Sequence, residues 1–234
     1  MIDIATPEFL NELQSLYPAT AKYLDGDWFL AAAVAFSSSN CPEAVPRVLR
    51  YALDALDKLP ETSYEDRRLL VRKMRDGLLK SGILSGYPKA INALVSLYEA
   101  TPEELRDTEP LRDSTRSKEE DAAAGQAYFD LTFGDTTAKI QPMLRSLYPD
   151  LEHFVVTVGY GYVYSFVEVI SDKETSFATI STMIANGTPS QVEWHLTRAV
   201  HHGATVEEAR AVREIALRIA IKAGVPLKIE VPNI

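Results

Sequence analysis

Three of the four histidines in the chain fall within one segment, residues 187–210, which reads GTPSQVEWHLTRAVHHGATVEEAR. Imidazole is the side chain best suited to proton transfer near neutral pH. A threonine–proline pair opens the segment and predicts a helix, on which His195 and His202 lie about two turns apart on one face. His201 is turned by about 120° from His195. We therefore expect only His195 and His202 to face one cavity, and we expect no metal site, because imidazoles that share an ion favour i, i+4 spacing.

A structural interpretation is available for the same segment. Thr188 and Gln191 occupy the N-cap and N3 positions of the predicted helix, where threonine and glutamine form a capping box. His201 and His202 precede Gly203, so compensation of the helix dipole at its C-terminus explains them without chemistry. A histidine on a helix is also often a packed residue, so catalytic and structural roles both stay open on residue type alone.

Residues 153–170, HFVVTVGYGYVYSFVEVI, carry three tyrosines that alternate with other residues. Tyr160, Tyr162 and Tyr164 could line a pocket for a flat unsaturated substrate, or fill the core for their buried area alone. β-Branched and aromatic residues favour a strand here. Since the neighbouring segments have helical periodicity, we expect a buried helix that is interrupted near Gly159 and Gly161.

The chain repeats itself. LQSLYP at 13–18 returns as LRSLYP at 144–149, identical at five of six positions. The segment that starts at Asn40 aligns without a gap with the segment that starts at Gly187, and SGYP at 85–88 resembles AGVP at 223–226. Landmarks in the same order in both halves indicate a tandem duplication.

Apolar residues recur at helical spacing through most of the chain, which predicts an all-α protein. We expect two helical repeats that pack as one globular unit. The N-terminal repeat would span 1–107 and the C-terminal repeat 126–234. Residues 108–125 are polar and densely charged, which is typical of a linker.

The composition excludes some classes of binding partner. With 33 acidic and 24 basic residues the formal net charge is −9, and no lysine or arginine cluster suited to phosphates is found, so nucleic acid is not expected as a partner. No apolar run is long enough to cross a bilayer, so no membrane association is expected. Without a leader pattern we expect a cytoplasmic protein. The single cysteine, Cys41, excludes an internal disulfide and a site built from several cysteines.

The second half carries YGYVYS (160–165), DKETSFATISTMIANG (172–187), HLTRAVHHGATVEEA (195–209) and AGVP (223–226). In this order and spacing the motifs resemble the carboxymuconolactone decarboxylase and alkylhydroperoxidase-D-like superfamily. The first half resembles the same pattern more weakly. The resemblance implies AhpD-like helical repeats, a homo-oligomer, a small-molecule substrate and a site around His195.

The peroxidase members of that superfamily use a Glu, a Cys-x-x-Cys pair and a His. The resemblance places Ser176, Thr188 and Gln191 at the Glu and two Cys positions, so the second half has no thiol for the disulfide-forming reaction. In the first half only Cys41 matches a thiol position. A two-thiol cycle is excluded in both halves.

The decarboxylase members need no metal or organic cofactor, and the resemblance implies the same here. His195 would transfer a proton, Tyr162, at the position of an expected Glu, would hold a carbonyl group, and His202 would assist. Substrate contacts would come from Tyr160, Tyr164, Ser176, Thr188 and Gln191. The prediction is a cofactor-independent lyase or isomerase that acts on a small unsaturated acid, lactone or polyketide-like metabolite.

Two alternatives stay open at this point. A catalytically inactive member that binds a ligand or a partner fits the loss of the thiols and the Tyr at the Glu position. A one-cysteine hydroperoxidase would use Cys41 with an external thiol.

Overall fold

The computed structural model describes residues 4–20, 22–227 and 230–234, and these residues contain helices and no β-strand. The all-α prediction is therefore confirmed. The helices of the first half are α1 (Pro7–Leu16), η1 (Tyr23–Asp25), α2 (Trp28–Ser38), η2 (Pro42–Ala44), α3 (Val45–Leu56), α4 (Tyr64–Ser85), α5 (Tyr87–Ala100) and η3 (Glu103–Leu105). Those of the second half are α6 (Lys118–Phe133), η4 (Gly134–Thr136), α7 (Thr137–Leu147), α8 (Pro149–His153), η5 (Phe154–Tyr164), α9 (Asp172–Ala185), α10 (Pro189–Ala199) and α11 (Val206–Lys222).

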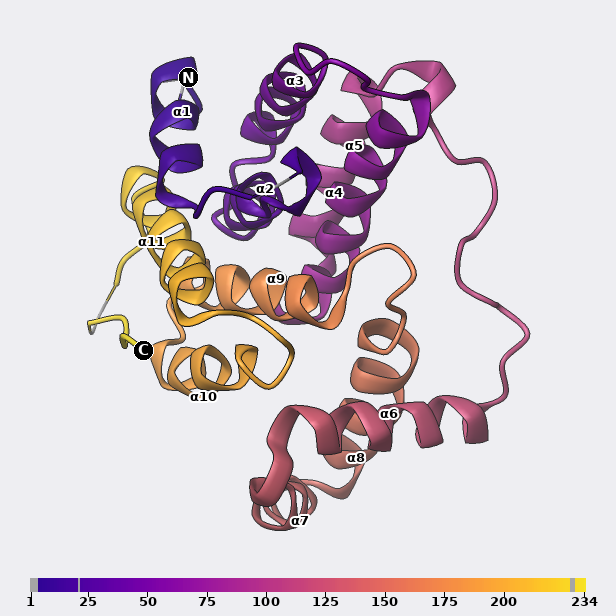
Figure 1. The fold of residues 1–234 in the computed structure, drawn as a ribbon. Coiled ribbons are helices and arrows are strands. Elements are labelled where there is room, and N and C mark those ends of the chain that lie inside the picture. Colours follow the sequence, from indigo (N-terminus) through magenta and orange to yellow (C-terminus); the bar gives the residue numbers. More distant parts are fainter. Residues whose placement is uncertain (1–3, 21, 228–229) are drawn as a thin grey trace.

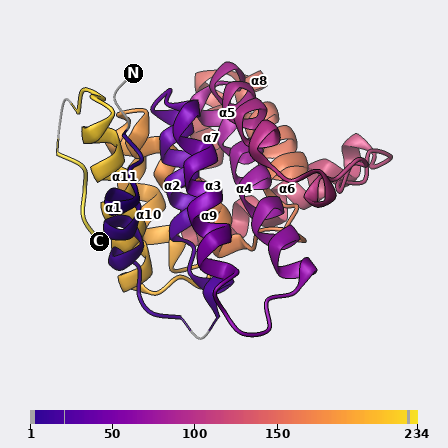
Figure 2. The same cartoon turned by 90° about the horizontal axis from the view of Figure 1, so that it is seen from above.

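The centre of the molecule is built from α2, α4, α9 and α11, which pack against one another (Figures 1 and 2). Every residue of α2 is buried, as expected for a helix that is apolar on all sides. From Glu174 to Ala185, α9 is buried in the same way. One continuous hydrophobic core includes residues from both halves of the chain, so the molecule is one globular unit.

Helices α2 and α9 occupy corresponding positions in the two halves of the chain. The gapless pairing of Asn40 with Gly187 also pairs Ser38 with Ala185, which are the last residues of α2 and α9. Helices α2 and α9 pack against each other, and each of them also packs against both α4 and α11. The tandem repeat stays a prediction, and the later part of the predicted linker, from Lys118 onward, lies in α6.

A second layer consists of α6, α7, α8 and η5, which lie together beside the central helices (Figure 1). A long extended segment joins this layer to the first half of the chain (Figure 1). The interior of this second layer is a separate small core rich in aromatic residues. The cavity described below lies where this layer meets the central helices.

The segment 154–164 is helical, as expected, but it is a single π-helix. The predicted interruption near Gly159 and Gly161 was wrong. The glycines serve close packing instead: a Cβ atom on Gly161 would lie 2.1 Å from the Asp121 carbonyl oxygen, and one on Gly125 would lie 2.0 Å from the Val156 carbonyl oxygen. Helices α6 and η5 therefore cross with their backbones in contact.

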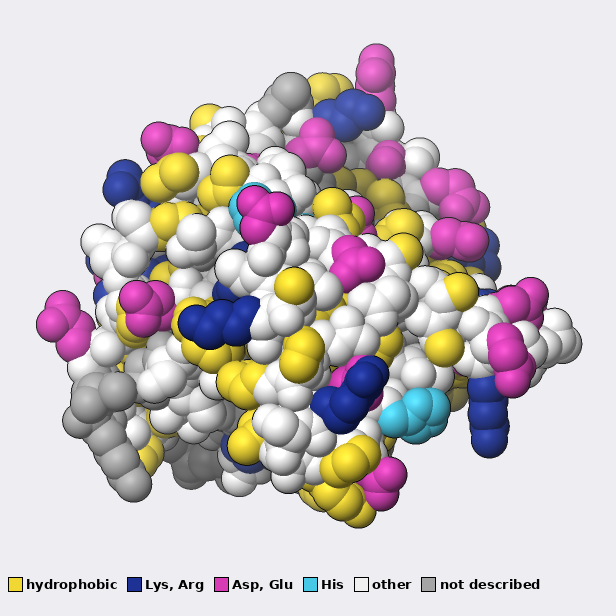
Figure 3. All heavy atoms as spheres, turned by 90° about the horizontal axis from the view of Figure 1, so that it is seen from below, with side chains coloured by type: hydrophobic (Ala, Val, Ile, Leu, Met, Phe, Trp, Pro, Cys, Tyr) yellow, Lys and Arg dark blue, Asp and Glu magenta, His cyan; other side chains and the backbone are white. Residues whose placement is uncertain are grey.

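No helix within the described residues is long and apolar enough to cross a bilayer. On the face viewed in Figure 3, hydrophobic side chains emerge between acidic and basic ones, without a continuous basic patch on that face.

Candidate functional site

A cavity of about 420 Å³ lies between the two layers. Aromatic and aliphatic side chains form most of its wall, and none of its lining residues carries a formal charge at neutral pH. They come from six helices: Ile83 and Leu84 of α4, Phe129 and Phe133 of α6, Ile140, Met143, Leu144 and Leu147 of α7, Phe154, Val155, Gly159, Tyr160 and Tyr164 of η5, Thr179 and Met183 of α9, and Gln191, Trp194 and His195 of α10. An apolar hollow with a few polar groups is the usual form of a small-molecule site.

His195 lies in the wall of this cavity, on α10. Its ring packs edge-on against Phe133, with 6.3 Å between the ring centroids. Within the described residues the imidazole makes no hydrogen bond, so its two nitrogens are available to a ligand. Burial lowers the pKa of His195 to about 4, and the positive charges of Arg198 and His202 act in the same direction. His195 is therefore neutral at physiological pH.

Tyr160 and Tyr164 line the same cavity from η5. Their rings are 5.5 Å apart and nearly perpendicular. Burial raises the pKa of both hydroxyl groups above the ordinary tyrosine value, so neither ionises near neutral pH. The Tyr164 hydroxyl is buried and has no hydrogen-bond partner of good geometry. Both tyrosines are thus hydrogen-bond donors and not bases.

Lys80 of α4 fixes the end of η5. Its ammonium group is 1% exposed and donates hydrogen bonds to the Phe166 carbonyl oxygen and the Thr175 hydroxyl, both at 2.7 Å. It also lies 3.6 Å from a carboxylate oxygen of Asp76. Burial lowers the pKa of Lys80 to about 8. This anchor holds the segment that carries Tyr164 against the central helices.

The capping box predicted for Thr188 and Gln191 was wrong. Thr188 is the N-cap residue of α10, but its side chain makes no capping bond and donates instead to the Met183 carbonyl oxygen at 3.0 Å. It does not line the cavity. Gln191 is free of the capping role and lines the cavity one turn before His195.

His202 is close to His195 but does not line the cavity. Its Nε2 atom is 3.1 Å from the Thr132 hydroxyl, and its Nδ1 atom is 2.9 Å from the Ser176 hydroxyl and 3.2 Å from the Asp172 carbonyl oxygen. Burial lowers the pKa of His202. The expectation that both histidines face one cavity does not match this geometry, and both His202 and Ser176 tie α9 to α6 and to the turn after α10.

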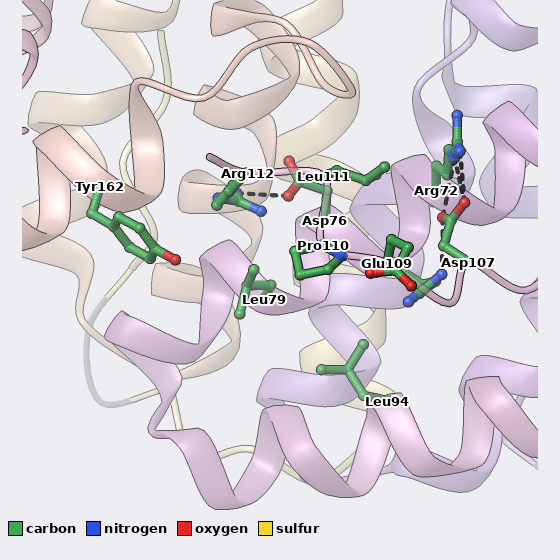
Figure 4. Close-up of a pocket in the computed structure, with 11 residues that line it drawn as sticks. Arg72, Asp76, Leu79, Leu94, Asp107, Glu109, Pro110, Leu111, Arg112 and Tyr162 are labelled. Atoms are coloured by element: carbon green, nitrogen blue, oxygen red, sulfur yellow. Dashed lines mark hydrogen bonds and ion pairs between the residues drawn. The ribbon is translucent and has the colours of Figure 1, made fainter. Parts of the chain in front are cut away.

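Tyr162 lies apart from His195. It is 40% exposed and lines a different hollow, with Arg112 and Asp76 among its neighbours (Figure 4). An ion pair of 2.7 Å joins Arg112 to Asp76 in that hollow. On a helix, residues two apart point in different directions, whereas Tyr160 and Tyr164, four apart, share a face. The predicted placement of Tyr162 beside the histidine is therefore not what the structure shows.

Cys41 is a free thiol at the N-cap of η2. Burial and the negative charge of Glu43 raise its pKa, which disfavours the reactive thiolate. At the position that pairs with His195 in the first half, Val48 is fully buried. No group of three or more potential metal ligands occurs within the described part of the chain.

Sequence reasoning missed several residues of the cavity wall. Thr179 follows Ser176 by one helical turn on α9, and Trp194 precedes His195, yet neither matched a chemical motif. The amphipathic pattern of 137–147 predicts a helix but does not say that its side chains line the same cavity as His195. The packing that brings α7 and α10 to one cavity leaves no local signal.

The carboxymuconolactone decarboxylase family model matches residues 149–225, which include η5, α9, α10 and α11. Together with the full-length relatives described next, this match shows that the chain belongs to the carboxymuconolactone decarboxylase family.

Two curated fungal proteins are similar over nearly the whole chain. Peroxisomal protein 2 of Schizosaccharomyces pombe is 30% identical over 203 residues, which cover 86% of this chain and 88% of the relative. Peroxisomal protein 2 of Saccharomyces cerevisiae is 26% identical, and the match covers 97% of this chain and 98% of the relative. No solved structure matches significantly. The family resemblance seen in the motifs is confirmed for the second half, and the similarity to the two relatives covers nearly the whole chain.

Proposed function

We propose that the chain is a cofactor-independent enzyme in which His195 transfers a proton to or from a carbon atom next to a carbonyl group. One observation carries the proposal: an imidazole without a hydrogen-bond partner in the described structure lines a mostly apolar cavity of about 420 Å³. The family membership supports it, because the histidine lies within the part of the chain that the family model matches.

The surrounding residues suit this chemistry. A neutral imidazole accepts the proton on one nitrogen, and the electron pair of the broken C–H bond moves into the carbonyl group. Tyr160 or Tyr164, whose hydroxyls stay protonated, donates a hydrogen bond to the oxygen that becomes negative. Return of the proton to another carbon atom completes an isomerisation. In this proposal the carbonyl-holding role first expected of Tyr162 moves to the two tyrosines of the cavity.

The test measures the exchange of substrate hydrogen for deuterium. Candidate unsaturated lactones and ketones are incubated with the protein in D2O, and exchange at the carbon next to the carbonyl is followed by NMR. General acid–base assistance contributes about 10² to 10⁴ in rate, so His195→Ala should slow exchange by that factor. Tyr162→Phe, outside the cavity, is the matched control and should exchange at the parental rate. Parental exchange by a folded His195→Ala variant would overturn the proposal.

A second candidate is an inactive family member that only binds a ligand. The low pKa of His195 favours it, because an imidazole with a pKa of about 4 is a weak base. Binding of the same lactones without deuterium exchange in any of them would support this candidate. The hydroperoxidase alternative predicts hydroperoxide consumption that Cys41→Ser removes, and the raised pKa of the thiol argues against it.

The names of the two relatives bear on location. Both are called peroxisomal, so we propose that this chain works in the peroxisome and not in the cytoplasm as the sequence analysis expected. Fluorescence microscopy of the tagged protein against a peroxisomal marker tests this. Uniform cytoplasmic signal would contradict it.

A further inference from the structure

The cavity beside His195 has an unusual electrostatic character for a site expected to take a small acid. None of its lining residues is Lys, Arg, Asp or Glu. Its polar side-chain groups are those of Thr179, Gln191 and His195, the hydroxyls of Tyr160 and Tyr164, and the indole N–H of Trp194, all of them uncharged near neutral pH. A carboxylate bound here would lose hydration without gaining a cation in the cavity wall, so its binding is disfavoured.

Arg198 and Lys80 lie near the cavity, and both side chains are engaged by other groups. The Arg198 guanidinium lies 4.6 Å from the centre of the Phe133 ring and donates to the Trp194 carbonyl oxygen and the Thr136 hydroxyl. Lys80 is held by carbonyl oxygens and Asp76, as described above. Neither side chain lines the cavity. The low pKa of His195 also removes the imidazolium as a partner for an anion.

The shape of the wall adds to this argument. His195 and Gln191 lie on α10, whereas Met143, Leu144 and Leu147 extend the cavity along α7 with aliphatic side chains only. A ligand that fits would have one hydrogen-bonding group near the histidine and an apolar body along α7. A volume of about 420 Å³ is within the range of small-molecule sites.

From this geometry we infer that the cavity binds an uncharged apolar molecule with a single carbonyl or hydroxyl group, and not a carboxylic acid. The inference rests on the proposed function only in taking this cavity as the substrate site. An uncharged substrate has no carboxylate to lose as carbon dioxide, so the proton transfer at His195 would be an isomerisation. This protein would thus retain the histidine of the family but bind a different class of substrate.

Three probes with a ten-carbon chain compare charge at similar chain length: 2-decanone, kept below its solubility limit, and decanoate and decyltrimethylammonium, each kept below its micelle concentration at pH 7.5. Trp194 lines the cavity, so its fluorescence in a Trp28→Phe background reports binding. We expect 2-decanone to bind at least tenfold more tightly than either ion. Equal or tighter binding of decanoate, or no binding of the ketone, would overturn the inference.

Matched variants locate the binding. Leu144→Phe reduces the space in the cavity and should weaken 2-decanone binding at least tenfold, and it adds no second tryptophan to the fluorescence signal. The same change at Leu131, which is 45% exposed on α6 and does not line the cavity, should leave binding unchanged. Gln191→Lys adds the missing cation and should strengthen decanoate binding at least tenfold. If Leu131→Phe weakens binding as much as Leu144→Phe does, the ligand is elsewhere and the inference fails.

His195→Ala separates this inference from the proposed function. Loss of deuterium exchange with ketone binding kept within a few-fold supports both. Ketone binding with unchanged exchange in His195→Ala contradicts the proposed function alone. Tighter binding of decanoate, with exchange that depends on His195, contradicts the inference alone.

Discussion

His195 determines what chemistry is available, because burial keeps its imidazole neutral. A neutral ring has one N–H donor and one acceptor nitrogen, so it can both receive a proton and donate a hydrogen bond. Phe133 packs edge-on against the ring and shields one side of it.

The first prediction at this scale concerns pH. The His195 resonance in an NMR titration should shift with a midpoint near 4 and not near the ordinary histidine value of about 6.5. Since the folded pKa is the lower one, His195 contributes to stability fully above about pH 6.5 and loses this contribution as the pH falls toward 4. Deuterium exchange should accordingly show no titration between pH 6 and 7. A midpoint near 6.5 would contradict the burial argument.

At the scale of elements, the site depends on how closely η5 approaches α6. Gly125 and Gly161 bring the two backbones together, and this contact sets the position of Tyr160 and Tyr164 on η5. A π-helix is rare and often occurs at functional sites. The Ser165 amide donates to the Tyr160 carbonyl oxygen at 2.9 Å, five residues earlier, which is the π-helical pattern.

Gly125→Ala tests this crossing. The new methyl group would lie 2.0 Å from the Val156 carbonyl oxygen, so the helices must separate. Overpacking of this kind typically costs about 1 to 3 kcal/mol. Chemical denaturation should show that loss, together with weaker ligand binding. Ala123→Gln, at an exposed position of the same helix, should change stability by about 0.5 kcal/mol or less. Equal stability of the two variants would contradict the close crossing.

At the scale of the whole molecule, the two halves meet through a buried acid pair. Asp27 precedes α2 and Glu174 lies in the first turn of α9, and the repeat alignment places them at equivalent positions. Burial and the charge of Glu174 both oppose ionisation of Asp27, so the two carboxyl groups share one proton most readily. Lys73 of α4 lies 2.5 Å from Glu174, and the Lys173 ammonium lies 3.4 Å from Asp27.

The proton is assigned by the surroundings. Burial and the charge of Glu174 raise the pKa of Asp27 to about 7, whereas Lys73 holds the pKa of Glu174 below its ordinary value. Tyr17 adds a hydrogen bond to Asp27 at 3.1 Å. Below neutral pH the pair therefore carries a single negative charge, on Glu174.

The substitution Asp27→Asn tests this assignment of the proton. The raised pKa means that Asp27 stabilises the fold fully below about pH 3.8 and loses that contribution as the pH rises through about 7. The amide cannot ionise, so the free energy of unfolding of the variant, relative to the parent, should improve between pH 5 and 8. The slope is at most about 1.4 kcal/mol per pH unit. Denaturation at several pH values checks this, and a pH-independent difference would contradict it.

The sequence alone was sufficient for the helical class and the family, and it singled out the histidine that lines the cavity. These depend on local features: apolar periodicity, and motifs whose order and spacing are visible along the chain. Tyr160 and Tyr164 were expected to line a pocket for a flat substrate, and Gln191 was expected at the site because the resemblance places it at a family site position; all three line the cavity beside His195.

Tertiary structure decided the rest. The π-helical geometry of η5, and the close contact of its Gly161 with α6, determine which tyrosines line the cavity with His195. The same geometry places Tyr162 outside that cavity. The part of the cavity wall supplied by α7, the partners of His202 and the absence of charge from the wall depend on residues far apart in the chain. Such contacts depend on how whole helices pack, and helix packing leaves no short-range pattern in the sequence.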